Sequence, residues 1–346
     1  ELLKLNLIDL FITKNIYYMF STTILRIGSI APELMEIFSW LHAEDGIRQY
    51  LYACLGNTSD EFNHCINTTW NLSSLSVYST LSDLHVSEEC LVTLIASGPS
   101  ASISIQEIQN NRNGQIIVAC GSALGVVAES GLHPDFVVLL ERGPSVYDDV
   151  KLLLDKYPSL SRSTLLAATS VDPRLSNLFS RTIYFFRQAS AVSKLYNPIA
   201  SDSLLICGPN VVNAAFEAFA QCGARSFMLV GCDFAGSASG RRLRAESATG
   251  GRYKRNLRIP IQGACGKTVF SDSRLIVSRD IIQKTIDSYS DLKIYRIGDG
   301  AMIKHVEQCD ISLISSIYSR YSLSGPTFSI NASDTSIYTR INDLNS

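Results

Sequence analysis

The chain has 346 residues, of which 46% are hydrophobic and 18% charged, and its formal net charge is -2. This length suits one large domain or two ordinary ones, and we expect two. The balanced charge creates no overall basic field that would attract nucleic acid. No apolar run reaches the roughly 18 residues of a membrane-spanning helix. These properties predict a cytoplasmic protein with no nucleic-acid partner and no membrane span.

Nine cysteines are spread along the chain without a CxxC pair or any paired spacing typical of a metal site. Several of them, such as Cys120, Cys207 and Cys232, fall in apolar runs that resemble strands. A buried thiol packs as a small hydrophobic group, and a reducing compartment keeps it free. We therefore expect reduced thiols and no bound metal.

Residues 1–88 are predicted to form a mostly helical accessory region. From Pro32 onward, apolar residues recur at helical spacing as far as Leu41. A stretch rich in Asn, Ser and Thr follows over 57–82 and is typical of loops with short helical pieces. This region shows no pattern of chemical groups that indicates catalysis.

From residue 91 the sequence alternates between short apolar runs and amphipathic stretches of about a dozen residues. Such alternation predicts an α/β fold with a mostly parallel sheet and helices on both faces. We expect strands at 91–97, 115–120, 136–141, 163–168, 182–187, 203–207, 226–231 and 292–297. We expect helices at 101–112, 122–131, 145–157, 172–179, 210–222 and 274–289. The predicted main domain covers 89–305.

Two similar turns follow predicted strands: Gly98-Pro99-Ser100 and Gly208-Pro209-Asn210. In each, an apolar run ends at Gly-Pro and a small polar residue begins a helix, a geometry that presents free N–H groups to an anion. Ligands of open parallel sheets bind beyond the carboxyl ends of the strands. The two turns could therefore hold the two ends of a nucleotide in one cleft, or they could be short connections with no other role.

Five further residues occupy comparable positions in the predicted sheet. Gly121 and Ser122 follow the second strand, and Asn213 lies in the first turn of the helix after Asn210. Glu141 and Asp233 each end a strand, where a carboxylate can bind a ribose hydroxyl, hold Mg²⁺, act as a base or simply cap a turn. We place nucleotide binding at the first three positions and catalysis at the two carboxylates.

Residues 234–273 are rich in Gly, Ser and Arg and almost free of apolar runs. A loop of this length within a domain is usually functional or disordered. It is either a solvated flexible loop or a lid whose arginines close over a phosphate or carboxylate. An RNA-binding arm is disfavoured because few aromatic residues are present to stack on bases. Beyond it, 306–346 is a C-terminal extension that we expect to be partly disordered.

The order of these motifs resembles the MptE-like (flag10) domain of the motility accessory factor (Maf) family. The resemblance covers about 91–305 and rests on sequence pieces in the family's order. These pieces are GPS at 98–100, GLHPDFVVLLE at 131–141, GPNVVNAAFEAFAQCGARSFMLVGCDFA at 208–235, the segment 263–274 and GDGAMI at 298–303.

The resemblance implies a Rossmann-like, sialyltransferase-like fold and a glycosyltransferase. Its expected donor is a CMP-activated nonulosonic acid, and its acceptor is Ser or Thr of a protein such as flagellin, with no cofactor required. Arg252, Lys267 and Thr268 would then bind substrate. A neighbouring branch implies instead a 6-hydroxymethylpterin diphosphokinase that uses ATP and Mg²⁺.

The chain departs from the family pattern at several positions. Ser102 stands where the family has Asp, Glu141 replaces a strand-end Asp, and Ala214 replaces Thr. Loss of the acid at Ser102 removes a carboxylate that the family uses for ribose or metal. A nucleotide-binding protein that has lost catalysis therefore stays open as a third reading.

Overall fold

The computed structural model of the chain describes residues 58–73, 79–112, 114–188, 190–196, 198–236, 245, 247–249, 257–321 and 328–331. All of them belong to one unit, Leu55–Ser346. Residues 1–57, which make up most of the predicted accessory region, lie outside this description.

Ten strands of the described chain form one parallel sheet. Its order is β1-β7-β6-β5-β4-β3-β9-β12-β13, and β8 pairs with β7 beside this path. The strands are β1 (Ser79–Thr80), β3 (Leu91–Ile95), β4 (Gln115–Cys120), β5 (Phe136–Leu139), β6 (Thr164–Ala168), β7 (Arg181–Arg187), β8 (Ser203–Leu204), β9 (Ser226–Val230), β12 (Lys293–Ile297) and β13 (Glu307–Cys309).

The chain reverses its direction across the sheet between β3 and β9. From β3 the strands succeed one another toward β7, whereas β9, β12 and β13 lie on the other side of β3. The order β5-β4-β3-β9-β12-β13 is the 3-2-1-4-5-6 order of a Rossmann fold. The mostly parallel α/β prediction is therefore confirmed, and the carboxyl ends of β3 and β9 mark the switch point where such sheets bind ligands.

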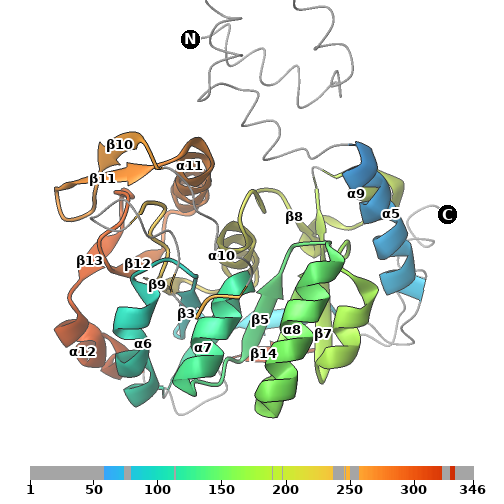
Figure 1. Ribbon diagram of the computed structural model, residues 1–346, viewed down its shortest axis with the longest axis horizontal. Helices are drawn as coiled ribbons and strands as arrows, with labels where there is room; N and C mark the ends of the chain where they lie inside the picture. Colours follow the sequence, from blue (N-terminus) through green and yellow to red (C-terminus); the bar gives the residue numbers. More distant parts are fainter. Residues whose placement is uncertain are drawn as a thin grey trace, which may run out of the picture. The chain divides into compact units, whose positions relative to one another are not determined.

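Helices cover both faces of the sheet. Figure 1 shows α6, α7 and α8 in a row in front of the strands, while α10 packs on β3, β4 and β5 and contacts α11. Right-handed crossovers place these helices on opposite faces, because the chain crosses the sheet in one direction through α6, α7 and α8 and in the opposite direction through α10. The helices are α5 (Thr58–Ser73), α6 (Ala101–Asn110), α7 (Leu124–Ser130), α8 (Pro144–Lys156), α9 (Ala191–Tyr196), α10 (Val211–Gln221), α11 (Ser273–Ser288) and α12 (Ile314–Ser319).

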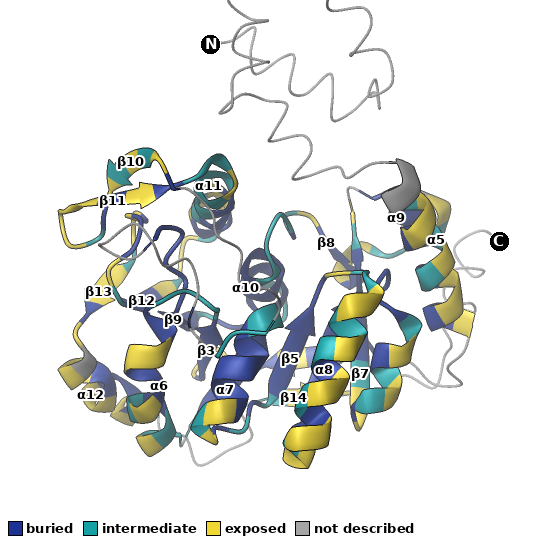
Figure 2. Cartoon of the chain, viewed as in Figure 1, coloured by how far each residue is buried: buried dark blue, intermediate teal, exposed yellow. Residues whose placement is uncertain are grey.

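The core lies on both faces of the central strands. Figure 2 shows these strands buried and the outer faces of the helices exposed. All five residues of β3 are buried, as are all six of β4. Their almost continuous apolar sequence reflects a strand that is covered on both sides. No helix among the described residues is long and apolar enough to cross a membrane.

Several elements differ from the sequence-based expectations. The strand expected at 203–207 pairs only over β8, and Leu205 is largely exposed. The helix expected at 172–179 is a short 3-10 helix, Pro173–Leu178. The Arg-rich stretch contains a hairpin of β10 (Ile259–Gln262) and β11 (Thr268–Ser271), whose four-residue strands are too short to be noticed in the sequence.

The two regions flanking 89–305 contribute strands to the sheets. β1 pairs with β7, and β13, beyond residue 305, extends the main sheet next to β12. β2 (Leu84–Val86) pairs with β14 (Phe328–Ile330) in a separate antiparallel ribbon. The described parts of both flanks are therefore joined to the main domain by backbone hydrogen bonds.

Candidate active site at the carboxyl edge of the sheet

The predicted turn Gly98–Ser100 lies at the switch point beside the turn that follows β9. The backbone N–H of Ala96 donates to Val230 O at 2.8 Å, and that of Gly98 donates to Gly231 O at 2.9 Å. A Cβ atom placed on Gly98 would lie 2.3 Å from Gly231 O, which no side chain tolerates. Glycine is therefore required here by the close approach of the two turns.

Asp233 joins these two turns by hydrogen bonds. Its side chain is only 4% exposed and accepts hydrogen bonds from Ser100 N at 2.9 Å and Ser100 Oγ at 2.5 Å. Burial raises the pKa of Asp233, and the hydrogen bonds from Ser100 act in the opposite direction. Because Ser100 is the N-cap of α6, the Asp233 carboxylate occupies the place at this helix start that a bound anion would take.

Arg296 is a buried charge that sequence reasoning missed. It lies on β12, is 1% exposed, and donates to the backbone oxygens of Ala301 and Asp233. Burial lowers the pKa of this arginine, while the nearby Asp233 raises it. The signal was an arginine within the apolar run LKIYRI just before Gly298. Arg296 thus joins the turns that follow β9 and β12. Its own charge is buried and is not exposed to a ligand.

The other predicted turns lie along the same edge. Ser122 donates its hydroxyl hydrogen to Ser97 Oγ at 2.9 Å, which joins the turns after β3 and β4. A Cβ atom placed on Gly121 would lie 3.1 Å from the Val211 side chain. The start of α10, and with it the Gly208-Pro209 turn, therefore reaches the β4 turn. The structure therefore brings together the predicted turns after β3, after β4 and at Gly208-Pro209.

The two asparagines of the second turn are engaged with α11. Asn213 is buried, donates to Ser278 O at 2.8 Å and accepts from Ser278 Oγ at 2.6 Å. Asn210 donates to the same Ser278 hydroxyl at 2.8 Å and caps α10. These amides hold α10 against α11. In the same turn, Gly208 and Pro209 are half-buried at the carboxyl edge of the sheet.

Part of the Arg-rich segment crosses the first two turns. Ala245 N donates to Ser97 O at 2.9 Å, and Thr249 N donates to Ser122 O at 2.9 Å. We call the described residues 245 and 247–249 the strap. A Cβ atom placed on Gly125 of α7 would lie 2.2 Å from Ser247 O, so a helix residue is glycine where the strap passes. The strap is thus packed over the switch point by backbone contacts.

The remaining predicted site residues lie apart from this edge cluster. Glu141 is exposed beyond β5, which is three strands from β9, or about 14 Å at ordinary strand spacing. Glu141 and Asp233 are therefore not brought together as a pair. Lys267 and Thr268 are exposed on the β10–β11 hairpin. Arg252 lies outside the described residues.

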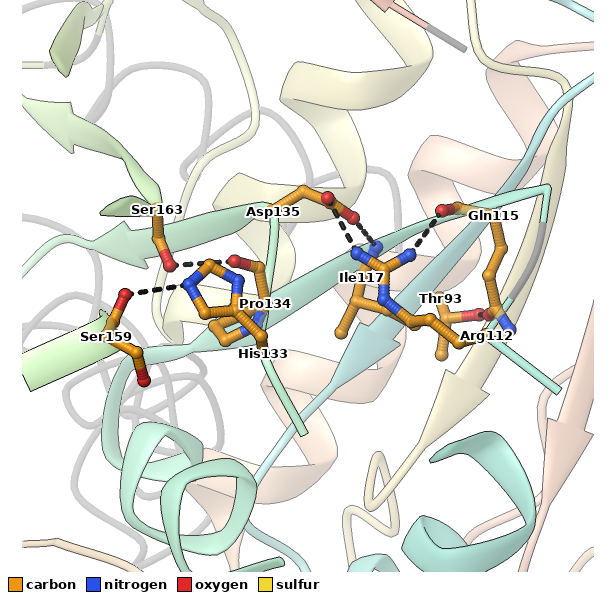
Figure 3. Close-up of polar contacts among 9 residues, drawn as sticks. All are labelled: Thr93, Arg112, Gln115, Ile117, His133, Pro134, Asp135, Ser159 and Ser163. Carbon is orange, nitrogen blue, oxygen red and sulfur yellow. Dashed lines mark hydrogen bonds and ion pairs between the residues drawn. The ribbon is translucent and has the colours of Figure 1, made fainter. Parts of the chain in front are cut away.

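The PDFVV motif has its polar residue at the opposite, amino edge of the sheet. Figure 3 shows Asp135 accepting hydrogen bonds from Arg112 and from Ile117 N, both at 2.7 Å. His133 bonds to Ser159 O at 2.8 Å. These contacts set the register of β4 and β5 and keep the histidine away from the carboxyl edge.

The fold and the switch-point turns define a doubly wound α/β protein with a Rossmann strand order. A family model described as "6-hydroxymethylpterin diphosphokinase MptE-like" matches residues 66–238, half of the chain. The chain belongs to this MptE-like family. A comparison with curated proteins finds no match.

Among solved structures, the chain is similar to a MAf glycosyltransferase from Magnetospirillum magneticum AMB-1. The sequence identity is 24% and the TM-score is 0.66, over 84% of this chain and 45% of that protein. The chain thus spans less than half the length of that protein. The likeness shows that the two share a fold, as the resemblance to the Maf family predicted.

Proposed function

We propose that the protein is a glycosyltransferase that transfers a nonulosonic, sialic-acid-like sugar from a CMP-activated donor to Ser or Thr of an acceptor protein such as flagellin. The observation that carries this proposal is the cluster of three turns at the switch point, crossed by the strap. Membership of the MptE-like family and a fold shared with a MAf glycosyltransferase support it. The reaction would take place in the cytoplasm.

In this proposal the nucleotide lies along the edge formed by Ser97, Ser122 and the Gly208 turn. The Asp233 carboxylate at the start of α6 repels a second anion there, so the phosphate lies on the outer side of the turn, near the strap. The arginines and lysines of 241–258 stabilise the charge that develops on the leaving phosphate. No metal or other cofactor is needed if these side chains supply that charge. Asp233 then acts by positioning the turn.

The second candidate is a diphosphokinase that uses ATP and Mg²⁺, which the printed description of the family model favours. This reaction requires carboxylates that hold Mg²⁺ between phosphates. Glu141 and Asp233 lie about three strands apart, and Ser100 engages both oxygens of Asp233. A binding protein without catalysis is the third candidate, motivated by Ser102 and Ala214.

Thermal-shift titrations with CMP, CDP, ATP with Mg²⁺, and a pterin separate these candidates. The transferase predicts stabilisation by the cytidine nucleotides, whereas the kinase predicts stabilisation by ATP with Mg²⁺ and by the pterin. Transfer of sugar from a CMP-sialic acid donor to a peptide acceptor, followed by mass spectrometry, separates a transferase from a binding protein. Stabilisation by ATP with Mg²⁺ alone would refute the transferase.

A variant that introduces a negative charge locates the nucleotide. Ser122→Asp places a negative charge on the half-exposed edge and should weaken CMP binding at least about tenfold. Ser159→Asp makes the same change at an exposed position near the amino edge and should leave binding unchanged. Gly98→Val is unsuitable, because its Cβ would collide with Gly231 O and disturb the fold.

A further inference from the structure

Arg187 stands at the carboxyl end of β7 without an acidic partner. It is the last residue of the strand and is half-buried. Its Nε is shielded from solvent and has no hydrogen-bond partner. No carboxylate among the described residues forms an ion pair with it. A shielded N–H group without an acceptor is costly to the folded protein, and a bound anion would remove that cost.

The neighbour of Arg187 is the second Gly-Pro turn. Arg187 pairs with Leu204 of β8, and the chain then reaches Cys207 just before Gly208. Burial raises the pKa of the Cys207 thiol, whereas its hydrogen bond and charge interaction with Arg187 act to lower it. The guanidinium therefore lies beside the turn that the sequence predicts to bind one end of a nucleotide.

A second unsatisfied group lies on the adjacent strand. Ala168 of β6 pairs with Phe185 of β7, and Thr169 N continues the ladder by donating to Phe185 O at 3.0 Å. Ser170 and Arg187 each follow two residues beyond this pair. Ser170 is 4% exposed, and its hydroxyl has no hydrogen-bond partner. The Nε of Arg187 and the hydroxyl of Ser170, both shielded and without hydrogen-bond partners, thus follow neighbouring strands at the same level of the sheet.

An acidic group that interacts with Cys207 is turned toward a different neighbour. Glu217 of α10 interacts with Cys207 electrostatically, and its hydrogen-bond partner is Thr285 of α11. Burial raises the pKa of Glu217, which favours its neutral form. Among the described residues Glu217 forms no ion pair with Arg187, and its hydrogen bond goes to Thr285 instead.

We infer that Arg187 and Ser170, beside the Gly208-Pro209 turn, form a subsite for an oxyanion, either a carboxylate or a phosphate. Arginine suits such a ligand because its planar N–H groups match two oxygens at once. The subsite lies three strands from Ser122, about 14 Å along the carboxyl edge. This inference rests on the proposed function in one respect: there, the subsite takes the sugar carboxylate while the nucleotide phosphate lies near the strap.

The test compares Arg187→Met with Arg181→Met. Methionine keeps an unbranched apolar chain and removes the charge. Arg181 is the control because it is exposed at the other end of the same strand. Each protein is titrated with sodium phosphate, sodium acetate and CMP at constant ionic strength, and binding is read from the thermal shift. Circular dichroism in plain buffer checks that each variant folds.

We expect phosphate, acetate or both to stabilise the wild type and the Arg181→Met variant. Arg187→Met should weaken that binding at least about tenfold, and Ser170→Ala should weaken it by a smaller factor. A response to acetate alone identifies a carboxylate subsite, and a response to phosphate alone a phosphate subsite. The inference is overturned if neither anion stabilises the wild type, or if Arg187→Met binds both within twofold of the wild type.

The CMP titration keeps the two proposals distinguishable. If the wild type does not bind CMP but Arg187→Met loses the anion response, the subsite stands and the transferase proposal fails. If the wild type binds CMP and Arg187→Met matches it with all three ligands, the transferase proposal stands and the subsite is absent.

Discussion

The contact between Asp233 and Ser100 makes a quantitative prediction. In Asp233→Ala, the buried N–H and hydroxyl of Ser100 lose their acceptor, at about 1–3 kcal/mol for each unsatisfied group. The expected loss is therefore about 2–6 kcal/mol in the free energy of unfolding at pH 7. Urea unfolding followed by far-UV circular dichroism measures it directly.

The matched variant Asp233→Asn should behave differently. An amide oxygen can still accept from Ser100 N, and the amide NH₂ can donate to Ser100 Oγ. Since burial raises the pKa of Asp233, removal of its charge also relieves a cost at pH 7. We expect the Asn variant to unfold within about 1 kcal/mol of the wild type. An Ala variant equally close to the wild type would refute the reasoning.

The same pair of variants separates positioning from direct contact with a ligand. If Asp233 acts by holding the turn, Asp233→Asn keeps CMP binding and Asp233→Ala loses it. An Asn variant that is stable but binds no CMP would mean that the carboxylate itself touches the ligand.

Three further predictions follow from other contacts. Gly125→Ala should displace the strap by a clash with Ser247 O and speed tryptic cleavage within 241–258. The control is Gly143→Ala, whose added Cβ meets only a contact of 3.7 Å and should not change the rate of cleavage. Equal rates of cleavage in the two variants would contradict the packing of the strap on α7. The folded pKa of Glu217 is raised above 4.5, so wild-type stability falls as pH rises from 4.5 through the folded value. Glu217→Gln does not titrate and should gain stability relative to the wild type between pH 4.5 and pH 8 in urea unfolding. Ser102→Asp adds a second negative charge to the first turn of α6, where the Asp233 carboxylate already lies, so it should gain less than the about 0.3–1 kcal/mol that an acid ordinarily contributes at a helix start; a full gain in the same assay would contradict this role of Asp233.

The sheet could be predicted from sequence because its strands are local patterns. β3 and β4 are continuous apolar runs, and Gly131, with a positive φ of 75°, ends α7 where the sequence places the end of a helix. The hairpin β10–β11 was missed because its strands are short and half polar. Exposed positions alternate with half-buried ones in β10 and with buried ones in β11, over only four residues in each strand.

The site was harder to predict because its contacts join distant parts of the chain. Ser100 and Asp233 are 133 residues apart, and Asn213 and Ser278 are 65 apart. Sequence patterns place each residue on an element, but they do not say which elements meet. The predicted turns were therefore located correctly, whereas the engagement of Asp233 with Ser100 was not foreseen. Arg187 was predicted only as the last residue of a strand.

The strap also has a consequence for the order in which the protein opens. Ala245 N and Thr249 N each donate one backbone hydrogen bond to turns that follow different strands, and Thr249 Oγ1 adds a bond of 3.3 Å to Ser122 O. Segments held by only a few hydrogen bonds outside a strand ladder open at a lower free energy than the core strands. Amide hydrogens of Ala245 and Thr249 should therefore exchange with deuterium long before those of β3. Entry of a ligand to the switch point would then need only this local opening, while the sheet below stays intact.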